Sequence, residues 1–124
     1  MDKQAISYSD FARMDLRIGT ILECSEVEGS QKLVKFLVDL GDLGKRTILA
    51  GIKGQVKPEE IVGLQVLVLA NLQPKMMMGQ ESQGMILMGV EKTSGDFEGD
   101  GGVEEEKITL LIPENKVPSG TGVE

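Results

Sequence analysis

The 124-residue sequence contains no histidine, no tryptophan and a single cysteine, Cys24. Without histidine it lacks the commonest general base and metal ligand, which excludes Ser-His-Asp and Cys-His catalysis. One cysteine allows neither an internal disulfide nor a cysteine-based zinc site. With no cation fixed near it in the sequence, Cys24 is better explained as a structural thiol than as a nucleophile. We therefore expect a binding domain that is not an enzyme, with no catalytic residues, no metal and no cofactor.

Long hydrophobic runs are absent as well. The longest, residues 64–72, is interrupted by Gln65 and Asn71 and is far shorter than the ~20 residues of a membrane-spanning helix. Residues 1–10 lack the apolar stretch of a signal peptide. We expect a cytoplasmic protein without a membrane partner. A chain of this length is enough for one domain with one core.

Positive charge is scarce and unevenly distributed. The formal net charge is −7, which taken over the whole chain argues against a nucleic-acid partner. Residues 1–80 contain ten Lys and Arg against ten Asp and Glu, which leaves three against ten for residues 81–124. The negative excess therefore lies in the last third, and the first two-thirds can still carry a basic face.

Hydrophobic patterning in the first half predicts β-strands. Residues 34–40 alternate apolar and polar side chains with period two, and the glycines of residues 41–44 predict a turn into a second strand at 46–50. An earlier strand, residues 16–22, changes its alternation at Gly19. That change of phase indicates a bulge or bend.

The remaining elements complete a recognisable order. Ser9-Asp10 predicts the cap of a helical turn, and Lys57-Pro58 predicts the start of a short helix that Gly63 ends. Further strands are expected at residues 66–72, 85–90 and 107–112. Three strands, a helix and two strands match a five-stranded OB-fold barrel. We predict an all-β protein of this fold with a short helix and a C-terminal β extension, as a single domain 1–124 with its core at 11–90 and an acidic loop and last strand at 91–124.

Two glycine-rich segments resemble ligand sites but are better explained as turns. Residues 41–47 look like part of a phosphate-binding loop, yet Arg46 stands where that motif requires Ser or Thr, and Asp39 stands at its first glycine. Residues 96–101 resemble the opening of an EF-hand loop, but Lys107 occupies the position of the bidentate Glu. We expect a hairpin turn at the first and a solvated acidic loop at the second, with weak calcium binding as the alternative there.

The segment NLQPKMMMGQESQGMILMG, residues 71–89, contains five of the seven methionines. We predict that it is a loop leading into the strand 85–90, where Met85 and Met88 are three residues apart and are expected on opposite faces. The run Met76–Met78 cannot be wholly buried, because consecutive strand residues alternate faces. It either folds over the open end of the barrel or offers an adaptable apolar surface, beside Lys75, to bases or to another subunit.

Several segments together resemble one family. They are DFARMDLRIGTI, VEGSQKLVKFLVDLG, ILAGI, PEEIVGLQVLVLANLQPKMMMG and ESQGMILMG. The sequence from about Phe11 to Gly89 resembles the tRNA-binding domain at the C-terminus of bacterial methionyl-tRNA synthetases, which also occurs as a free-standing dimeric protein. The resemblance is weaker beyond Val90. The sequence alone leaves open whether this chain is free-standing or a fragment of a longer synthetase.

The resemblance implies an OB-fold homodimer that binds tRNA by its shape and works with a methionyl-tRNA synthetase catalytic region in cis or in trans. Two departures lower the expected affinity: the methionines at 76–78, where related sequences often carry a basic residue, and the acidic insert at 96–106. The alternative function is that of an export-related or general chaperone-like OB-fold dimer that binds protein. Those relatives differ at residues 29–33 and in the Ser-x-Gly-Met motif.

The residues expected to contact RNA combine the cations of the predicted strands and loops with polar groups from the methionine-rich segment. Aromatic residues make up 3% of the chain, too few for a platform that stacks single-stranded bases, so contacts to the shape and backbone of folded RNA fit better. The expected RNA-binding residues are Lys32, Lys35, Arg46, Lys53, Asn71, Lys75, Ser82 and Met85. Neighbouring Lys45 adds to the same basic set.

Overall fold

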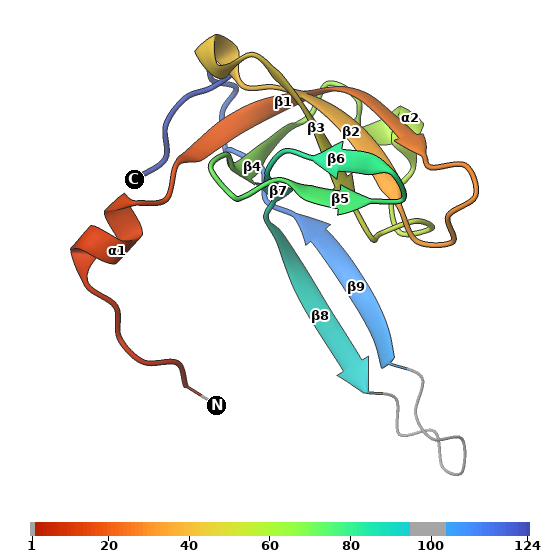
Figure 1. The fold of residues 1–124 in the computed structure, drawn as a ribbon, viewed down its shortest axis with the longest axis horizontal. Helices are drawn as coiled ribbons and strands as arrows, with labels where there is room; N and C mark the ends of the chain where they lie inside the picture. Colours follow the sequence, from red (N-terminus) through yellow and green to blue (C-terminus); the bar gives the residue numbers. More distant parts are fainter. Residues whose placement is uncertain (1, 95–103) are drawn as a thin grey trace.

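The computed structural model describes residues 2–94 and 104–124, which form mainly antiparallel strands (Figure 1). In chain order the elements are α1 (Tyr8–Ala12), β1 (Leu16–Glu26), β2 (Val34–Asp39), the 3-10 turn η1 (Gly41–Leu43), β3 (Lys45–Ala50), α2 (Pro58–Ile61), β4 (Gln65–Leu69), β5 (Lys75–Met77), β6 (Gln80–Ser82), β7 (Met85–Ile86), β8 (Met88–Ser94) and β9 (Glu104–Leu110). A five-stranded sheet has the order β3-β2-β1-β4-β7, and β5–β6 and β8–β9 are separate hairpins. Because β7 and β6 also contact β3, the sheet is nearly closed. The predicted all-β OB-fold barrel is confirmed.

The long strand β1 pairs with two different strands along its length, and this arrangement lets the sheet curl. Residues 16–20 pair with β4, whereas residues 20–26 pair with β2. The register shifts between Ile21 and Glu23, so Leu22 forms a bulge. A bulge increases the local twist of a strand, and here it lies where β1 passes from one partner to the other.

The predicted bulge in this first strand is confirmed: it lies at Leu22, just past Gly19, and the glycine itself has a further role. Gly19 is buried, and a Cβ at this position would collide with the side chains of Val38 and Leu40. The space above Gly19 is therefore filled by side chains from β2, the neighbouring strand of the same sheet, and from the residue that follows it. A larger residue has no space there.

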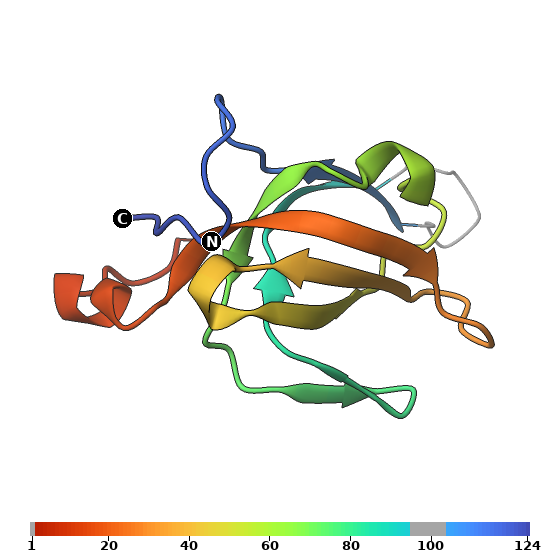
Figure 2. The same cartoon turned by 90° about the horizontal axis from the view of Figure 1, so that it is seen from above.

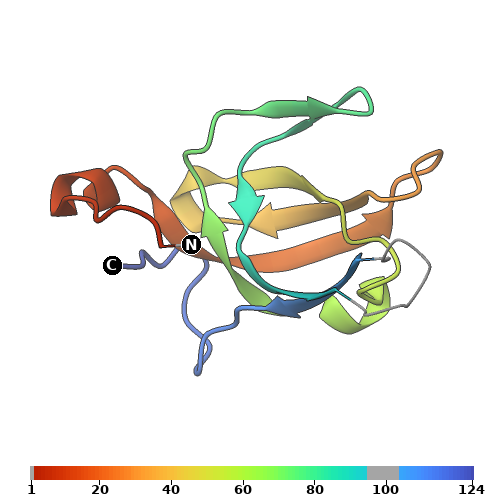
Figure 3. The same ribbon diagram turned by 90° about the horizontal axis from the view of Figure 1, so that it is seen from below.

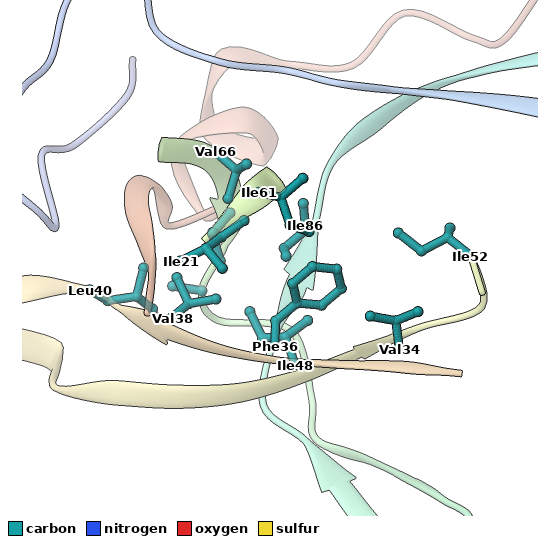
Figure 4. Packing of buried hydrophobic residues seen from close by; sticks show 12 residues of the cluster. Ile21, Val34, Phe36, Val38, Leu40, Ile48, Ile52, Ile61, Val66 and Ile86 are labelled. Atoms are coloured by element: carbon teal, nitrogen blue, oxygen red, sulfur yellow. The ribbon is translucent and has the colours of Figure 1, made fainter. Parts of the chain in front are cut away.

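The core fills the barrel with aliphatic side chains around one ring. Phe36 lies in the middle of the cluster (Figure 4). Its fully buried neighbours include Ile21, Val34, Val38, Leu40, Ile48, Val66 and Val68. Each such side chain contributes roughly 1.5–3 kcal/mol of hydrophobic stabilisation. The alternation of residues 34–40 thus predicted both strand β2 and its buried face.

The C-terminal residues run along the half of β1 that β2 leaves unpaired. The backbone N–H of Gly120 donates to the carbonyl of Ile18 at 2.7 Å, and the N–H of Ile18 donates to the carbonyl of Thr121 at 2.8 Å. The buried Gln65 amide accepts from the N–H of Val117 at 3.0 Å and donates to its carbonyl at 2.6 Å. These bonds satisfy backbone groups that would otherwise form an exposed sheet edge.

Several predicted boundaries are corrected by the structure. The cap of α1 is Ser7, whose Oγ accepts from the N–H of Asp10 at 3.2 Å, and not the predicted pair Ser9-Asp10. The strand predicted at 85–90 is divided into β7 and β8, because the chain bends at Leu87, whose N–H donates to the carbonyl of Leu67. The last strand ends at Leu110 and not at residue 112. The resemblance of residues 96–101 to an EF-hand lies outside the described residues.

Candidate nucleic-acid interface

The methionine run is a short hairpin and not the predicted loop. β5 and β6 pair with Met77 opposite Gln80, and the two intervening residues, Met78 and Gly79, have φ of 51° and 75°. Positive φ at both positions is the signature of a type I′ turn, which suits the twist of a hairpin. A non-glycine residue at positive φ is uncommon, so the turn explains the strained backbone of Met78.

Alternation within this hairpin decides where each methionine lies. Met77 is half-buried against a small satellite cluster formed by Val27, Leu33 and Leu49. Met76, one residue earlier, points the other way and is 63% exposed. Figures 2 and 3 show the hairpin running alongside β3, with its turn at the same end of the barrel as the loop between β1 and β2. The run therefore combines one packing residue with two exposed methionines.

Ser82 and Gln83 attach this hairpin to the free edge of β3. The Oγ of Ser82 accepts from the N–H of Leu49 at 3.0 Å and donates to the carbonyl of Gly84 at 3.3 Å. The Gln83 side-chain oxygen accepts from the N–H of Thr47 at 3.2 Å, and its backbone N–H donates to the Thr47 carbonyl at 2.8 Å. Ser82 is 5% exposed and both of its hydrogen bonds close the barrel, so its observed role is structural, and a contact of its hydroxyl with RNA stays a prediction.

A cleft of about 320 Å³ opens between the hairpin β5–β6 and the base of the hairpin β8–β9. Its floor and walls are mainly apolar, and they include Leu49, Ile52, Met77, Met85, Ile86 and Ile108. Lys75, Gln73 and Glu106 are the polar side chains that line it besides Ser82. Met85 and Met88 both line this one cleft, contrary to the expectation that they face opposite sides, because the bend at Leu87 separates their strands.

Three of the expected lysines surround the satellite cluster on the outside of the barrel. Lys32 is exposed in the loop between β1 and β2, and Lys35 is exposed on β2 directly opposite Leu49. Lys53 is joined to the same loop, since its Nζ donates to the carbonyl of Ser30 at 2.8 Å. Its backbone N–H also donates to the carbonyl of Lys32 at 2.9 Å. With Lys75 on β5, these cations lie on elements that meet at one end of the barrel.

Acidic residues share those elements and limit the basic character of the surface. Glu26 ends β1, Glu28 follows in the next loop, and Glu81 on β6 is exposed. The surface is therefore mixed in charge and can neutralise a few phosphates, whereas a continuous basic stripe would neutralise many.

Arg46 and Asn71 form a separate group near the start of β1. The Arg46 guanidinium donates to the carbonyl of Ala70 at 3.2 Å. The Asn71 side chain accepts from the N–H of Asp15 at 2.9 Å and donates to the carbonyl of Arg13 at 2.7 Å. Asn71 thus anchors the junction of α1 and β1. Its amide is already engaged, which makes it a bracing residue, while its exposed position still borders the surface.

Arg17 and the acidic residues beside it were missed by sequence reasoning. Its Nε is 2.8 Å from a carboxylate oxygen of Asp15, and its Nη1 is 3.5 Å from one of Asp42. The hydrogen bond that the Arg17 guanidinium donates to the Asp15 carboxylate raises the pKa of Arg17. The alternation of β1 placed Arg17 outward, but no local signal shows that the turn carrying Asp42 folds next to it. Because its guanidinium is paired with the carboxylates of Asp15 and Asp42, Arg17 has a structural role.

Glu106, Gln73 and Val90 were also missed as residues that line the cleft. No motif contains them. The one available signal was the alternation of the last strand, which puts Glu106 and Ile108 on one face. That face could be assigned to a cleft only once residues of β5 and of the hairpin β8–β9 were seen to line the same space.

Other candidate sites give no chemistry. The segment 41–47, which resembles a phosphate-binding loop, is the hairpin turn between β2 and β3. Burial, with the charges of Glu26 and Glu59, raises the pKa of the half-buried Cys24 thiol and keeps it protonated. Within residues 2–94 and 104–124 no group of three or more His, Cys, Asp or Glu side chains is arranged to hold a metal. In the same part of the chain no helix is long and apolar enough to cross a membrane.

An OB barrel with lysines at one end is an architecture typical of nucleic-acid-binding domains. The model of the family described as "Putative tRNA binding domain" matches residues 16–122. The chain belongs to this family.

Its relatives include synthetases of much greater length. It is 43% identical over 122 residues to the methionine--tRNA ligase of Methanothrix thermoacetophila, a match that covers 98% of this chain and 16% of that protein. It is 52% identical over 86 residues to the methionine--tRNA ligase of Dichelobacter nodosus, covering 69% of this chain and 13% of that one. The chain therefore spans about a sixth of the length of these relatives.

Two solved structures are similar over nearly their whole length. A MetRS-related protein from Pyrococcus horikoshii superposes with a TM-score of 0.79 at 30% identity, covering 98% of this chain and all of that one. The chaperone CsaA from Bacillus anthracis superposes with a TM-score of 0.77 at 28% identity, with the same coverage. The same overall fold thus occurs in proteins of about this size.

Proposed function

We propose that this chain binds tRNA and acts as an accessory domain for a methionyl-tRNA synthetase catalytic region, in cis or in trans, in the cytoplasm. The observation that carries the proposal is the membership of residues 16–122 in the tRNA-binding family, together with its relation to methionine--tRNA ligases. Lys32, Lys35, Lys53 and Lys75 supply the charges for phosphate. Asn71, Ser82 and Gln83 hold the surface in shape.

The proposal requires that affinity comes from a few phosphate contacts. Each neutralised phosphate on a duplex contributes ~0.9 to the slope of log affinity against log salt concentration. We expect saturable binding to total tRNA in a gel shift, with a slope of roughly two to four. The chain alone should not aminoacylate tRNA, since the relatives that do so are about six times longer. Binding that does not change with salt would refute the proposal.

The second candidate function is a chaperone-like binding of protein. It is favoured by the similarity to the solved chaperone CsaA and by the apolar cleft. An unfolded polypeptide bound through apolar contacts would show little salt dependence. The same gel-shift and salt series, repeated with a reduced unfolded protein as the ligand, therefore separates the two functions.

We also propose that the chain forms a symmetric homodimer. Leu64 and Ile112 are exposed and line one shallow hollow, and the exposed Leu111 precedes Ile112 in the chain after β9. Clustered apolar side chains on a small domain are typical of an interface. Sedimentation at tens of micromolar should give twice the mass of the 13.4 kDa chain. A strictly monomeric species would contradict this proposal without affecting tRNA binding.

A further inference from the structure

The cleft between the two hairpins combines features that the phosphate contacts do not use. Its volume of about 320 Å³ lies at the small end of the range for ligand pockets, ~300–1,000 Å³. Most of its lining is apolar, but Lys75, Gln73 and Glu106 are placed around it. A purely apolar ligand would leave the polar groups unused. A phosphate alone would leave the apolar floor exposed.

We propose that this cleft receives one unstacked, amino-bearing nucleobase of the bound RNA, such as adenine or cytosine. The inference rests on the proposed tRNA binding and names the part of the RNA that the cleft takes. A nucleobase has an apolar face, a polar edge and a phosphate attached through its sugar. Folded RNAs present such bases in loops and at ends, where proteins recognise them by packing on the face and bonding to the edge.

The apolar side chains suit the face of a base although none of them is aromatic. Met77, Met85 and Met88 all line the cleft, and Met85 is 46% exposed. Methionine sulfur makes favourable contacts with aromatic rings, and its flexible side chain adapts to an irregular shape. Leu49 and Ile86 beneath them are buried and give the cleft a fixed floor.

The polar groups define the orientation of the base. The ammonium of Lys75, exposed at the start of β5, can meet a phosphate. Glu106 lies on β9, in the other wall, on the same face as Ile108. Its carboxylate repels phosphate and accepts hydrogen bonds, which fits the amino group of cytosine or adenine, and the Gln73 amide can pair with an adenine edge. The RNA backbone would therefore pass on the β5 side, with the amino edge toward β9.

Methionine methyl groups provide a direct test, since an aromatic base shifts nearby methyl resonances upfield by its ring current. In the full chain labelled with 13C-methyl methionine, adenosine and cytidine 5′-monophosphates should shift Met77, Met85 and Met88. Met14 and Met76, outside the cleft, should not move. Uridine 5′-monophosphate, which lacks an amino group, should bind several-fold more weakly. Total tRNA should shift the same three methyl groups.

Two substitutions with matched controls test the contacts. Met85→Glu places a charge in the cleft and should weaken tRNA binding about tenfold more than Met78→Glu, which adds the same charge at an exposed turn residue outside the cleft lining. Glu106→Ala should raise the affinity for all three nucleotides but remove the preference for adenosine and cytidine over uridine. Thr109→Ala, on the exposed face of the same strand, should leave that preference intact.

The outcomes separate this inference from the proposed function. Salt-dependent tRNA binding that leaves the three cleft methyl groups unshifted would overturn the nucleobase inference and leave tRNA binding in place. Shifts of these methyl groups by an unfolded polypeptide, with none by the nucleotides, would also overturn it and assign the cleft to protein. Absence of binding to tRNA and to all three nucleotides would refute both proposals.

Discussion

The Oγ of Ser82 accepts a hydrogen bond from the backbone N–H of Leu49 at 3.0 Å, and this pair joins the hairpin β5–β6 to the edge of β3. The Ser82 side chain here replaces a backbone hydrogen bond between two strands. The hydroxyl also donates to the carbonyl of Gly84, so it satisfies two buried backbone groups at once. The hairpin that carries Lys75 and Met77 is therefore positioned by a residue that does not itself face solvent.

Replacing Ser82 with Ala should destabilise the fold by about 1–3 kcal/mol, because it leaves the Leu49 N–H and the Gly84 carbonyl without a partner. Thermal unfolding measures the loss. Ser25→Ala, at an exposed serine of β1, is the control and should change stability by no more than ~0.5 kcal/mol. A Ser82 variant with unchanged melting temperature and weaker tRNA binding would instead show that the Ser82 hydroxyl contacts the RNA.

Lys75→Ala should weaken tRNA binding several-fold without changing the melting temperature, since its side chain is exposed and the proposed function uses its charge to contact phosphate. The slope of log affinity against log salt should fall by about one. Lys57→Ala is the control: it removes another exposed charge, beside Glu60 at the start of α2, and should have a smaller effect. Equal losses for the two variants would show that only the total charge matters.

Gly19→Ala should destabilise the protein by roughly 1–3 kcal/mol, because the added methyl group collides with Val38 and Leu40 in the core. Gly51→Ala provides the comparison, since a Cβ at Gly51 has no atom within 4 Å. Chemical denaturation should show a lower midpoint for the first variant alone. Equal midpoints would mean that β1 and β2 can move apart around residue 19 without a loss of stability.

The Cys24 thiol should react slowly with iodoacetamide near pH 8, because burial raises its pKa and reduces the thiolate fraction. The unfolded thiol has a pKa of about 8.5. The stability that comes from the raised pKa is complete below that value and is lost as pH rises through the folded pKa. Reaction rates of folded and urea-unfolded protein test this, and a faster folded thiol would contradict it. A Cys24→Ala variant should lose this part of the pH dependence.

Ile112→Asp should convert the proposed dimer into a monomer, because it places a charge in the exposed apolar area with Leu111 and Leu64. Sedimentation velocity follows the change. Ile6→Asp is the control, since Ile6 is similarly exposed, at 66% against 60% for Ile112, but lies before α1 at the other end of the chain. A dimer that survives Ile112→Asp would place the interface elsewhere.

The sequence by itself determined the elements whose signals are local. Alternation in residues 34–40 defined β2 with its buried Val34, Phe36 and Val38, because a strand exposes every second side chain. Turn residues and the short helix gave the strand order, and with it the OB class. The same local logic showed that Met76–Met78 could not all be buried.

Only the tertiary structure decided which polar side chains remain free for a ligand. The sequence indicated that Ser82 and Asn71 are surface groups. Their side chains instead form hydrogen bonds with the backbone of Leu49 and Asp15, which lie 33 and 56 residues away in the chain. The cleft depends on the packing of β5–β6 and β8–β9 against one barrel wall. The alternation of β9 could place Glu106 and Ile108 on one face, but it could not show that Met85 lines the same cleft. A hydrogen bond between residues far apart in the chain leaves no periodic pattern in the sequence. Residues that brace the fold therefore could not be distinguished from residues that bind a ligand without the tertiary structure.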